Sequence, residues 1–235
     1  MWQDACESIN KSVAVIVRKT VDKKGDDVWQ TVGTAFQISS KPLPTFLTCA
    51  HVLLDGHGRD RWEHALLSGF GTTRCLPAGI RIEHISLELD AVVFVSGNEA
   101  NCKSVSGFSS TVLTMGNSVA AIGFPLPKQP ELYEKSGSLC VNMRFSAGYV
   151  SSHETYARLD KTLYTLLDLK HYEMNMFCYP GLSGGPLFDL EANIVGMVRG
   201  TALVNGNHEW SPAAAYSYAD RSLEIIDFLN PLGLI

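Results

Sequence analysis

The sequence has no long apolar stretch, no basic cluster and no secretory signal, and each absence excludes a class of protein. No apolar run approaches the roughly 18–20 residues of a membrane-spanning helix. The lysines and arginines are scattered over a chain with a formal net charge of −5, so the basic footprint of a nucleic-acid-binding surface is missing. The first apolar run, 12–17, is shorter than a signal-peptide core, and Asp4 and Glu7 stand where such a signal carries basic residues. We therefore expect a soluble, intracellular and most simply cytoplasmic protein with neither a membrane nor a nucleic-acid partner.

Closely spaced cysteine pairs are also missing. The six cysteines are dispersed along the chain, and without a secretory signal we expect reduced thiols rather than disulfides. A structural zinc site needs a cluster of the CxxC or HExxH kind, and the cysteines and histidines form none. The sequence therefore predicts no metal and no organic cofactor.

What the sequence does contain is a series of short apolar runs separated by turn-forming residues. Hydrophobic residues make up 46% of the chain, enough for a sizeable core, and 20 glycines and 10 prolines are spread along its 235 residues. Each run is rich in β-branched or aromatic residues and too short for a typical helix, so each predicts a strand. The runs are 12–17, 31–38, 45–50, 91–95, 119–124 and 193–198.

The remaining patterned segments predict one more strand, two connections and one helix. Residues 84–89 alternate in polarity, which is typical of a half-buried strand. The charged segment 22–27 predicts a turn, and the three prolines within 125–130 predict a loop. Residues 219–229 predict a C-terminal helix with Asp220 as its N-cap. One helical face would carry Leu223, Ile226 and Leu229, and Pro231 and Gly233 would end the helix.

The strongest chemical signal is the segment GLSGGPL at 181–187. Glycines around Ser183 let the backbone turn sharply and present both the hydroxyl and neighbouring N–H groups to one substrate atom. Acyl transfer needs that arrangement, because negative charge develops on the carbonyl oxygen and must meet preorganised donors. A glycine-rich hairpin with a passive serine would give a similar segment.

Two further segments supply partners for such a serine. FLTCAHV at 46–52 places His51 at the end of an apolar strand, where a rigid element can hold it, although a lone histidine there is more often structural. LDAVVF at 89–94 places Asp90 at the entry to a fully apolar run. A buried carboxylate is costly unless it is paired, and an imidazole is a natural partner. A solvent-facing aspartate at a strand edge is the alternative.

The order histidine, aspartate, serine, each in a suitable local setting, resembles the trypsin-like (chymotrypsin-fold) serine peptidases. Within them the pattern is closest to intracellular HtrA/Deg-type protease domains lacking a PDZ domain. The matching motifs are TCAH at 48–51, LDAVV at 89–93 and LSGGPL at 182–187, together with GTAF at 33–36, VAAIGFP at 119–125 and AGYVS at 147–151. The resemblance runs from roughly residue 10 to residue 229.

The resemblance implies an all-β fold of two packed six-stranded antiparallel barrels with a short C-terminal helix. The whole chain, 1–235, would be one peptidase unit. Its first barrel, over approximately 10–105, would carry His51 and Asp90, and its second, over 106–235, Ser183 and the helix. No activation cleavage near residue 1 is expected, and no cysteine follows Ser183 to brace a specificity pocket. The proline-rich stretch 125–139 departs from the family pattern, so the resemblance does not define the substrate-binding loops.

The resemblance also assigns roles to individual residues. His51 would be the general base, Asp90 would orient it, and Ser183 would attack the substrate carbonyl. The amides of Gly181 and Ser183 would form the oxyanion hole. The chain is thus expected to be a serine endopeptidase that hydrolyses protein or peptide substrates through an acyl-enzyme.

The same resemblance locates a substrate pocket. Its floor would be Phe177, one wall Val198, Arg199 and Gly200, and a second wall the segment 212–215. An aromatic floor carries no acid to pair with lysine or arginine. We therefore expect small or aliphatic residues at the cleaved position.

Three other interpretations stay open. The G-x-S-x-G pattern around Ser183 also fits an α/β-hydrolase, but strands dominate before it and His208 is the one histidine after it. A dormant or inactive domain of the same fold could serve as a binding or scaffold module. A viral-type processing protease would share the chemistry but cleave few sites. The sequence does not define the oligomeric state, and a homo-oligomer is compatible with it.

Overall fold

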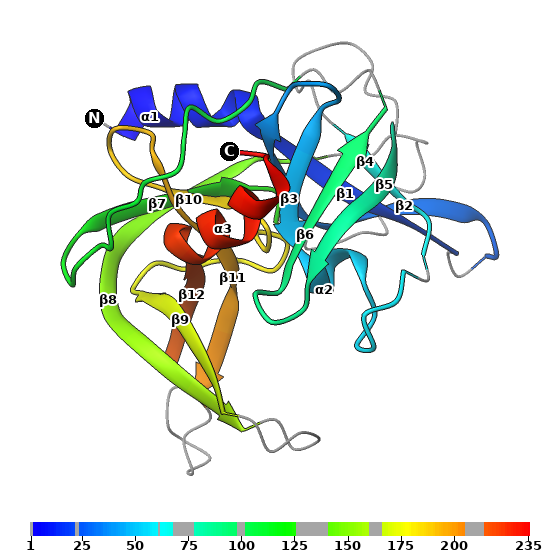
Figure 1. Cartoon of the computed structure of the whole chain (residues 1–235). Helices are drawn as coiled ribbons and strands as arrows, with labels where there is room; N and C mark the ends of the chain where they lie inside the picture. The colour runs from blue at the N-terminus through cyan, green and yellow to red at the C-terminus, as the bar shows by residue number, and fades with distance from the viewer. Residues whose placement is uncertain are drawn as a thin grey trace.

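The computed structural model describes residues 2–21, 24–60, 62–67, 78–97, 102–125, 141–159, 166–204 and 214–235. The strands in these ranges form two closed antiparallel barrels that lie side by side (Figure 1). None of the helices in the described part of the chain is both long and apolar enough to cross a membrane.

The first barrel has the strand order β1-β2-β3-β6-β5-β4. Its strands are β1 (Val13–Val21), β2 (Asp27–Ser39), β3 (Thr45–Cys49), β4 (His64–Leu67), β5 (Ala78–Ser86) and β6 (Ala91–Ser96). The predicted charged turn lies between β1 and β2, where Gly25 has a φ of 90°. Closure of the barrel pairs β3 with β6, so that Cys49 lies opposite Ala91. This pairing brings the residues after β3 next to those before β6.

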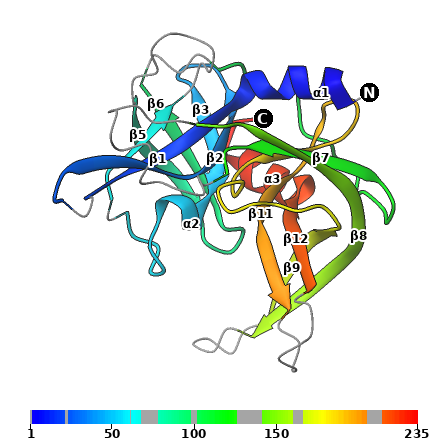
Figure 2. The same ribbon diagram turned by 180° about the vertical axis from the view of Figure 1, so that it is seen from behind.

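The second barrel has the strand order β10-β11-β12-β9-β8-β7. Its strands are β7 (Ser118–Gly123), β8 (Arg144–Leu159), β9 (Leu166–Met174), β10 (Pro186–Phe188), β11 (Ile194–Val204) and β12 (Ala214–Arg221). The ends of β8, β9, β11 and β12 extend beyond the rest of the molecule as two long ribbons (Figures 1 and 2). The predicted proline-rich loop lies almost entirely outside the described residues.

The cores explain why the short apolar runs become strands. The inward side chains of the first barrel form a continuous buried cluster in which the rings of Phe46 and Phe94 stack with centroids 5.5 Å apart. A second cluster fills the other barrel around the fully buried Tyr172. Burial of this apolar surface is the main favourable contribution to folding.

Short helices flank the barrels. They are α1 (Trp2–Ile9), η1 (Asn10–Ser12), α2 (Ala50–Leu53), α3 (Ser222–Leu229) and η4 (Asn230–Leu232). The α1 helix, which the apolar runs did not predict, buries Ala5 and Ile9. Its Trp2 ring meets Phe188 of β10 edge-on at 5.9 Å. The α1 helix thereby connects the N-terminus to the second barrel before the chain enters β1 of the first.

One prediction about local structure is only partly right, and a second is wrong. The strand expected at 84–89 ends at Ser86, and most of its residues, Leu87 among them, are exposed rather than half-buried. Asp220 does not cap the last helix. It is a buried residue of β12, and the helix begins at Ser222 with Arg221 in the N-cap position. Ion pairing within the second barrel, described below, accounts for the position of Asp220.

Candidate active site

His51 and Asp90 are brought together by the pairing of β3 with β6. His51 lies in the short α2 helix directly after β3, and Asp90 is the last residue before β6. The amide of Ala50 donates a 2.7 Å hydrogen bond to the carbonyl of Asp90, which joins the two segments at their ends. Two residues 39 positions apart in sequence therefore become neighbours.

The Asp90 carboxylate contacts His51 twice. One oxygen accepts a hydrogen bond from the His51 amide at 2.9 Å, and the other lies 2.6 Å from the imidazole Nδ1. The backbone of Asp90 has a φ of 53°, a left-handed conformation that aspartate adopts more readily than most residues. The Asp90 side chain is 13% exposed, whereas that of His51 is 48% exposed. The imidazole is thus held from its buried side and open on the other.

Ser183 lies in a tight loop between β9 and β10 of the second barrel. Gly181 and Gly184 have φ values of 97° and 82°, the left-handed region that favours glycine. A Cβ on Gly184 would lie 2.1 Å from the Thr48 hydroxyl and 2.3 Å from the Thr34 carbonyl, both in the first barrel. The predicted glycine-rich segment is therefore a loop packed closely against the opposite barrel.

Thr34 anchors this loop from the first barrel. Its amide donates to the Ser183 carbonyl at 2.9 Å, and its hydroxyl donates to the Gly181 carbonyl at 2.7 Å. The same hydroxyl accepts a 2.9 Å hydrogen bond from the Phe124 amide of the second barrel. Thr34 is fully buried, so these contacts are shielded from water. Its motif was recognised from the sequence, but this role was not.

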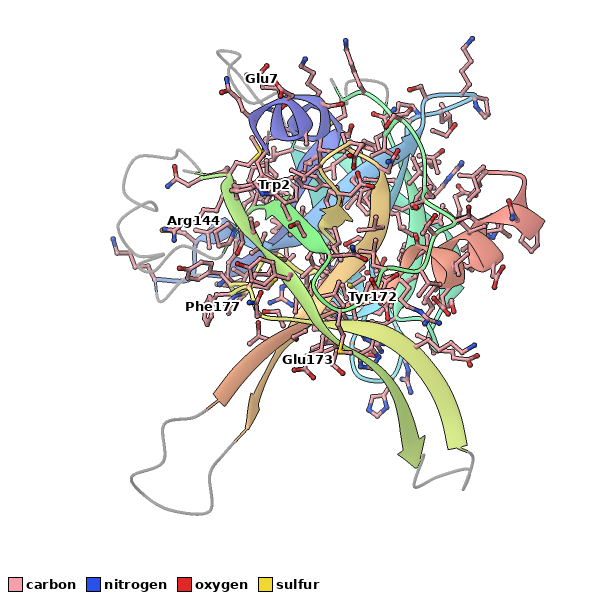
Figure 3. All side chains as sticks on the ribbon, turned by 90° about the vertical axis from the view of Figure 1, so that its left-hand side faces the viewer. Trp2, Glu7, Arg144, Tyr172, Glu173 and Phe177 are labelled. Carbon is pink, nitrogen blue, oxygen red and sulfur yellow. The ribbon has the colours of Figure 1, made fainter. Side chains whose placement is uncertain are left out.

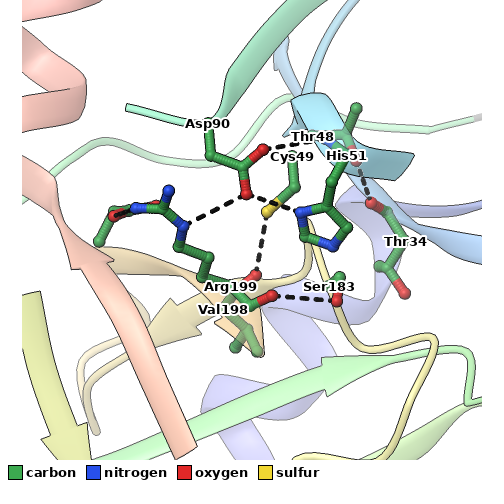
Figure 4. A network of polar contacts seen from close by, with 9 residues as sticks. Thr34, Thr48, Cys49, His51, Asp90, Ser183, Val198 and Arg199 are labelled. Carbon is green, nitrogen blue, oxygen red and sulfur yellow. Dashed lines mark hydrogen bonds and ion pairs between the residues drawn. The ribbon is translucent and has the colours of Figure 1, made fainter. Parts of the chain in front are cut away.

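The Ser183 hydroxyl donates to the carbonyl of Arg199 at 3.1 Å, a contact drawn in Figure 4. Among the described residues, His51 does not accept this hydrogen bond. The amides of Gly181 and Ser183 donate to no backbone carbonyl in the described chain.

Arg199 also extends its side chain to Asp90. Its Nε lies 3.3 Å from the Asp90 oxygen that faces His51 (Figure 4). Its Nη1 lies 3.2 Å from a carboxylate oxygen of Asp220. The Arg199 side chain is 13% exposed and that of Asp220 is 4% exposed. The sequence assigned Arg199 to a pocket wall and Asp220 to a helix cap, and no local signal links either residue to Asp90.

Burial and neighbouring charges shift the pKa values of Asp220 and Arg199. Burial raises the pKa of Asp220 to about 7, although the Arg199 guanidinium acts in the opposite direction. Burial lowers the pKa of Arg199, but the carboxylates of Asp220 and Asp90 outweigh this effect and the net pKa is raised. Arg199 is therefore a permanent cation between the buried Asp220 and the partly buried Asp90.

Cys49 lies beside the same pair. Its Sγ, the His51 ring and the Asp90 carboxylate offer atoms within 4.8 Å of one another, a spacing that a metal ion could bridge. Burial raises the pKa of the Cys49 thiol well above its ordinary value, and the thiol donates to the Val198 carbonyl at 3.3 Å. The neutral Cys49 thiol already donates a hydrogen bond to the Val198 carbonyl, and the His51 Nδ1 already shares one with Asp90. Hydrogen bonding accounts for this cluster without an ion.

The predicted pocket residues lie around the Ser183 loop. Val198 is fully buried, and Gly200 follows Arg199 on β11. Phe177 is 50% exposed, and its ring meets Tyr179 edge-on at 4.6 Å. The Arg144 guanidinium lies over the same Tyr179 ring at 5.2 Å, on the side of the molecule shown in Figure 3. Residues 212 and 213 of the second wall lie outside the described residues, and the pocket assignment stays a prediction.

Two closed antiparallel barrels, with a histidine and an aspartate on one and a glycine-flanked serine on the other, define the class of two-barrel peptidases. The model of the trypsin-like peptidase domain matches residues 33–197, most of the chain. The protein therefore belongs to the trypsin-like peptidase family, a family of serine peptidases.

Solved structures with the same fold include the Rv3671c protease and an HtrA-type protease. The active form of the Rv3671c protease from M. tuberculosis has a TM-score of 0.69 at 18% identity, covering 97% of this chain and 84% of that one. Its inactive form has a TM-score of 0.65 at 17% identity, covering 97% and 92%. The HtrA-type protease AlgW, solved with a decapeptide, has a TM-score of 0.63 at 17% identity, covering 99% and 68%. A comparison with curated protein sequences finds no match.

Proposed function

We propose that the protein is a serine endopeptidase in which Ser183, His51 and Asp90 form the catalytic triad. The observation that carries the proposal is the 2.6 Å contact between Asp90 and the Nδ1 of His51. A histidine held at Nδ1 leaves Nε2 to act as the base. Membership of the trypsin-like peptidase family and the loop around Ser183 support the same assignment.

In the proposed reaction, His51 takes the proton of the Ser183 hydroxyl as its oxygen attacks the substrate carbonyl. Collapse of the tetrahedral intermediate breaks the peptide bond, and His51 returns the proton to the leaving amine. A water molecule then hydrolyses the acyl-enzyme by the reverse sequence of proton transfers. Asp90 keeps the imidazole in one tautomer and stabilises its cationic form without itself becoming protonated.

The amides of Gly181 and Ser183 would bind the oxygen that becomes negative during the attack. The two hydrogen bonds from Thr34 hold this loop against the first barrel before substrate arrives. Preorganised donors cost no reorganisation during the reaction, and loss of one such donor lowers turnover by about 10²–10³-fold in a comparable protease.

One step must precede the attack. The Ser183 hydroxyl is bonded to the Arg199 carbonyl and would have to leave it, by rotation about the Cα–Cβ bond, before it could donate to His51. Staggered rotamers are separated by small barriers, so this rotation is fast compared with peptide hydrolysis. Catalytic hydrogen bonds of this kind often tighten only when substrate is bound.

Substrates of this site would be proteins or peptides. The AlgW structure, which contains a decapeptide, shows a peptide with a protease of this fold. For the cleaved position we keep the prediction of small or aliphatic residues, based on Phe177. A peptide-library profile dominated by arginine or lysine would reject it.

The test is labelling by a fluorophosphonate probe, which reacts only with a serine activated by its base and oxyanion donors. Native protein should be labelled, while heat-denatured protein and a Ser183→Ala variant should not. A His51→Ala variant should lose labelling as well, although its serine is intact. Labelling of the Ser183→Ala variant at the native rate would show that another residue reacts and would reject the assignment.

The second candidate is an inactive domain that binds or scaffolds proteins. The hydrogen bond from Ser183 to the Arg199 carbonyl, in place of one to His51, is the observation that favours it. This candidate predicts well-folded native protein that the probe does not label at any pH.

A further inference from the structure

The side chain and the backbone of one residue contact two members of the proposed triad. The Arg199 carbonyl accepts the Ser183 hydroxyl at 3.1 Å, and its Nε lies 3.3 Å from Asp90. Arg199 comes from β11 of the second barrel, whereas Asp90 belongs to the first. The ion pair therefore crosses from one barrel to the other at the point where the triad has to be assembled.

Arg199 is held in this position by Asp220. The neighbouring strands β11 and β12 pair so that Met197 lies opposite Asp220, and the Asp220 carboxylate meets Nη1 of Arg199 at 3.2 Å. The second oxygen of Asp220 has no hydrogen-bond partner among the described residues. The contacts with Asp90 and Asp220 fix the guanidinium at two points.

We propose that Arg199, held by Asp220, is a positioning residue that binds the Asp90 carboxylate beside His51 and tunes the basicity of the imidazole. This inference rests on the proposed triad. One Asp90 oxygen receives the amide of His51, and the other is shared between the His51 ring and Arg199. The carboxylate has little freedom to rotate away from the imidazole, because donors approach it from three directions.

The charges around Asp90 give the direction of the electrostatic effect. His51 faces it from α2, the neutral thiol of Cys49 from β3, Arg199 from β11, and Tyr218 and Asp220 from β12. Arg199 is the one permanent cation in this set. A cation on the far side of Asp90 offsets part of the negative charge that stabilises the imidazolium, so removal of the guanidinium should strengthen that stabilisation.

The direct test follows the protonation of the His51 ring by NMR as a function of pH, with the His51 signal assigned from a His51→Asn variant. Removing Arg199 alone would leave two buried carboxylates without their cation, so the informative variant is Arg199→Met combined with Asp220→Asn. Its matched control is Asp220→Asn alone, which keeps the guanidinium next to Asp90. An Arg199→Gln/Asp220→Asn variant serves as a polar version if the methionine variant does not fold.

We expect the His51 midpoint of the double variant to lie about one pH unit above that of Asp220→Asn, because Arg199 and the His51 ring contact the same Asp90 oxygen and a nearby charge shifts a pKa by about that amount. An Arg199→Lys/Asp220→Asn variant, which restores the charge without the fork of donors, should return the midpoint towards that of Asp220→Asn. An unchanged or lowered midpoint in the double variant would overturn the inference.

Fluorophosphonate labelling across the same pH range separates this inference from the proposed function. If the triad is active, the labelling rate of the double variant should fall off at a higher pH on the acid side of its profile. The shift should equal the shift of the NMR midpoint. If wild-type protein is not labelled at any pH, the proposed function fails, while the NMR midpoints still decide whether Arg199 tunes His51.

Discussion

The hydroxyl of Thr34, in the first barrel, donates a 2.7 Å hydrogen bond to the carbonyl of Gly181, in the loop of the second barrel that carries Ser183. This contact is fully buried and is reinforced by the hydrogen bond from the Thr34 amide to the Ser183 carbonyl. The position of the proposed nucleophile therefore depends on the barrel that carries His51 and Asp90, as well as on its own.

Replacing Thr34 by valine tests this dependence. Valine keeps the shape of the side chain but removes the donor to Gly181 and the acceptor of the Phe124 amide. We expect a loss of about 1–3 kcal/mol in the free energy of unfolding, because buried polar groups lose their partners. Probe labelling of Ser183 should slow by more than tenfold. The control is Thr34→Ser, which keeps the hydroxyl, and equal labelling rates for the valine and serine variants would contradict the anchoring role.

Gly184 offers a second test of how the barrels meet. An alanine Cβ at this position would overlap the Thr48 hydroxyl and the Thr34 carbonyl, and it would also adopt an unfavourable positive φ. Gly116 has a similar φ of 89°, but nothing lies within 4 Å of a Cβ there. We expect Gly116→Ala to lower the stability by about 1–2 kcal/mol through backbone strain alone.

The Gly184→Ala variant should lose clearly more stability than Gly116→Ala, because steric overlap between the barrels is added to the same strain. Denaturant unfolding of the two variants beside the wild type measures both effects. Similar losses in the two would show that the Ser183 loop can move away from the first barrel at little cost.

The parts of the fold that the sequence predicted are those set by local patterns. The run before His51 and the run after Asp90 became β3 and β6, and the glycines around Ser183 became the expected tight loop. Each of these features depends on a few adjacent residues. Barrel topology followed from the family resemblance, which covers nearly the whole chain.

The features that the sequence did not predict depend on pairing between distant strands. The sequence around Asp220 predicts a helix cap, but the register of β12 against β11 buries this residue beside Arg199. Residues 84–89 alternate in polarity as in a half-buried strand, but Leu87 lies in the turn that ends at Asp90. A local pattern carries no information about which strand will lie opposite, so such contacts need the three-dimensional structure.

Substitution of Asp90 tests the orienting contact with His51. Asparagine has nearly the same shape, but it presents an amide to Nδ1 and favours the wrong imidazole tautomer. We expect labelling and peptide hydrolysis to fall by about 10⁴-fold, the loss found for this change in a comparable triad. The control is Asp189→Asn, the same substitution in a turn of the second barrel whose carboxylate contacts Asn193. It should leave the rate near that of the wild type, and a small loss in Asp90→Asn would contradict the role of Asp90.

The buried thiol of Cys49 should be chemically inert despite lying next to His51. Its side chain is fully buried, and burial raises its pKa well above the ordinary value, so almost no thiolate forms at neutral pH. Cys6 is partly exposed, although burial also raises its pKa. Mass spectrometry after brief treatment with iodoacetamide should find Cys6 modified before Cys49. A Cys49→Ala variant should keep its probe reactivity, and rapid modification of Cys49 in native protein would refute this prediction.

The buried carboxyl of Asp220 should make the stability depend on pH in an unusual direction. Burial raises its pKa to about 7 in the folded protein, against roughly 3.9 in the unfolded chain. Between about pH 4 and 7 the folded state therefore binds a proton that the unfolded state has already released. The contribution of Asp220 to stability is most favourable below that window, decreases as the pH rises through it and is constant above about pH 7.

An Asp220→Asn variant removes this contribution, since asparagine does not titrate. The difference in melting temperature between the variant and the wild type should consequently shift in favour of the variant as the pH is raised from 5 to 8. Arg199 keeps its contact with Asp90 in the variant, so the guanidinium is not left without a partner. A difference that stays constant across this range would mean that Asp220 is ionised throughout, and that its attraction to Arg199 outweighs the cost of burying its charge.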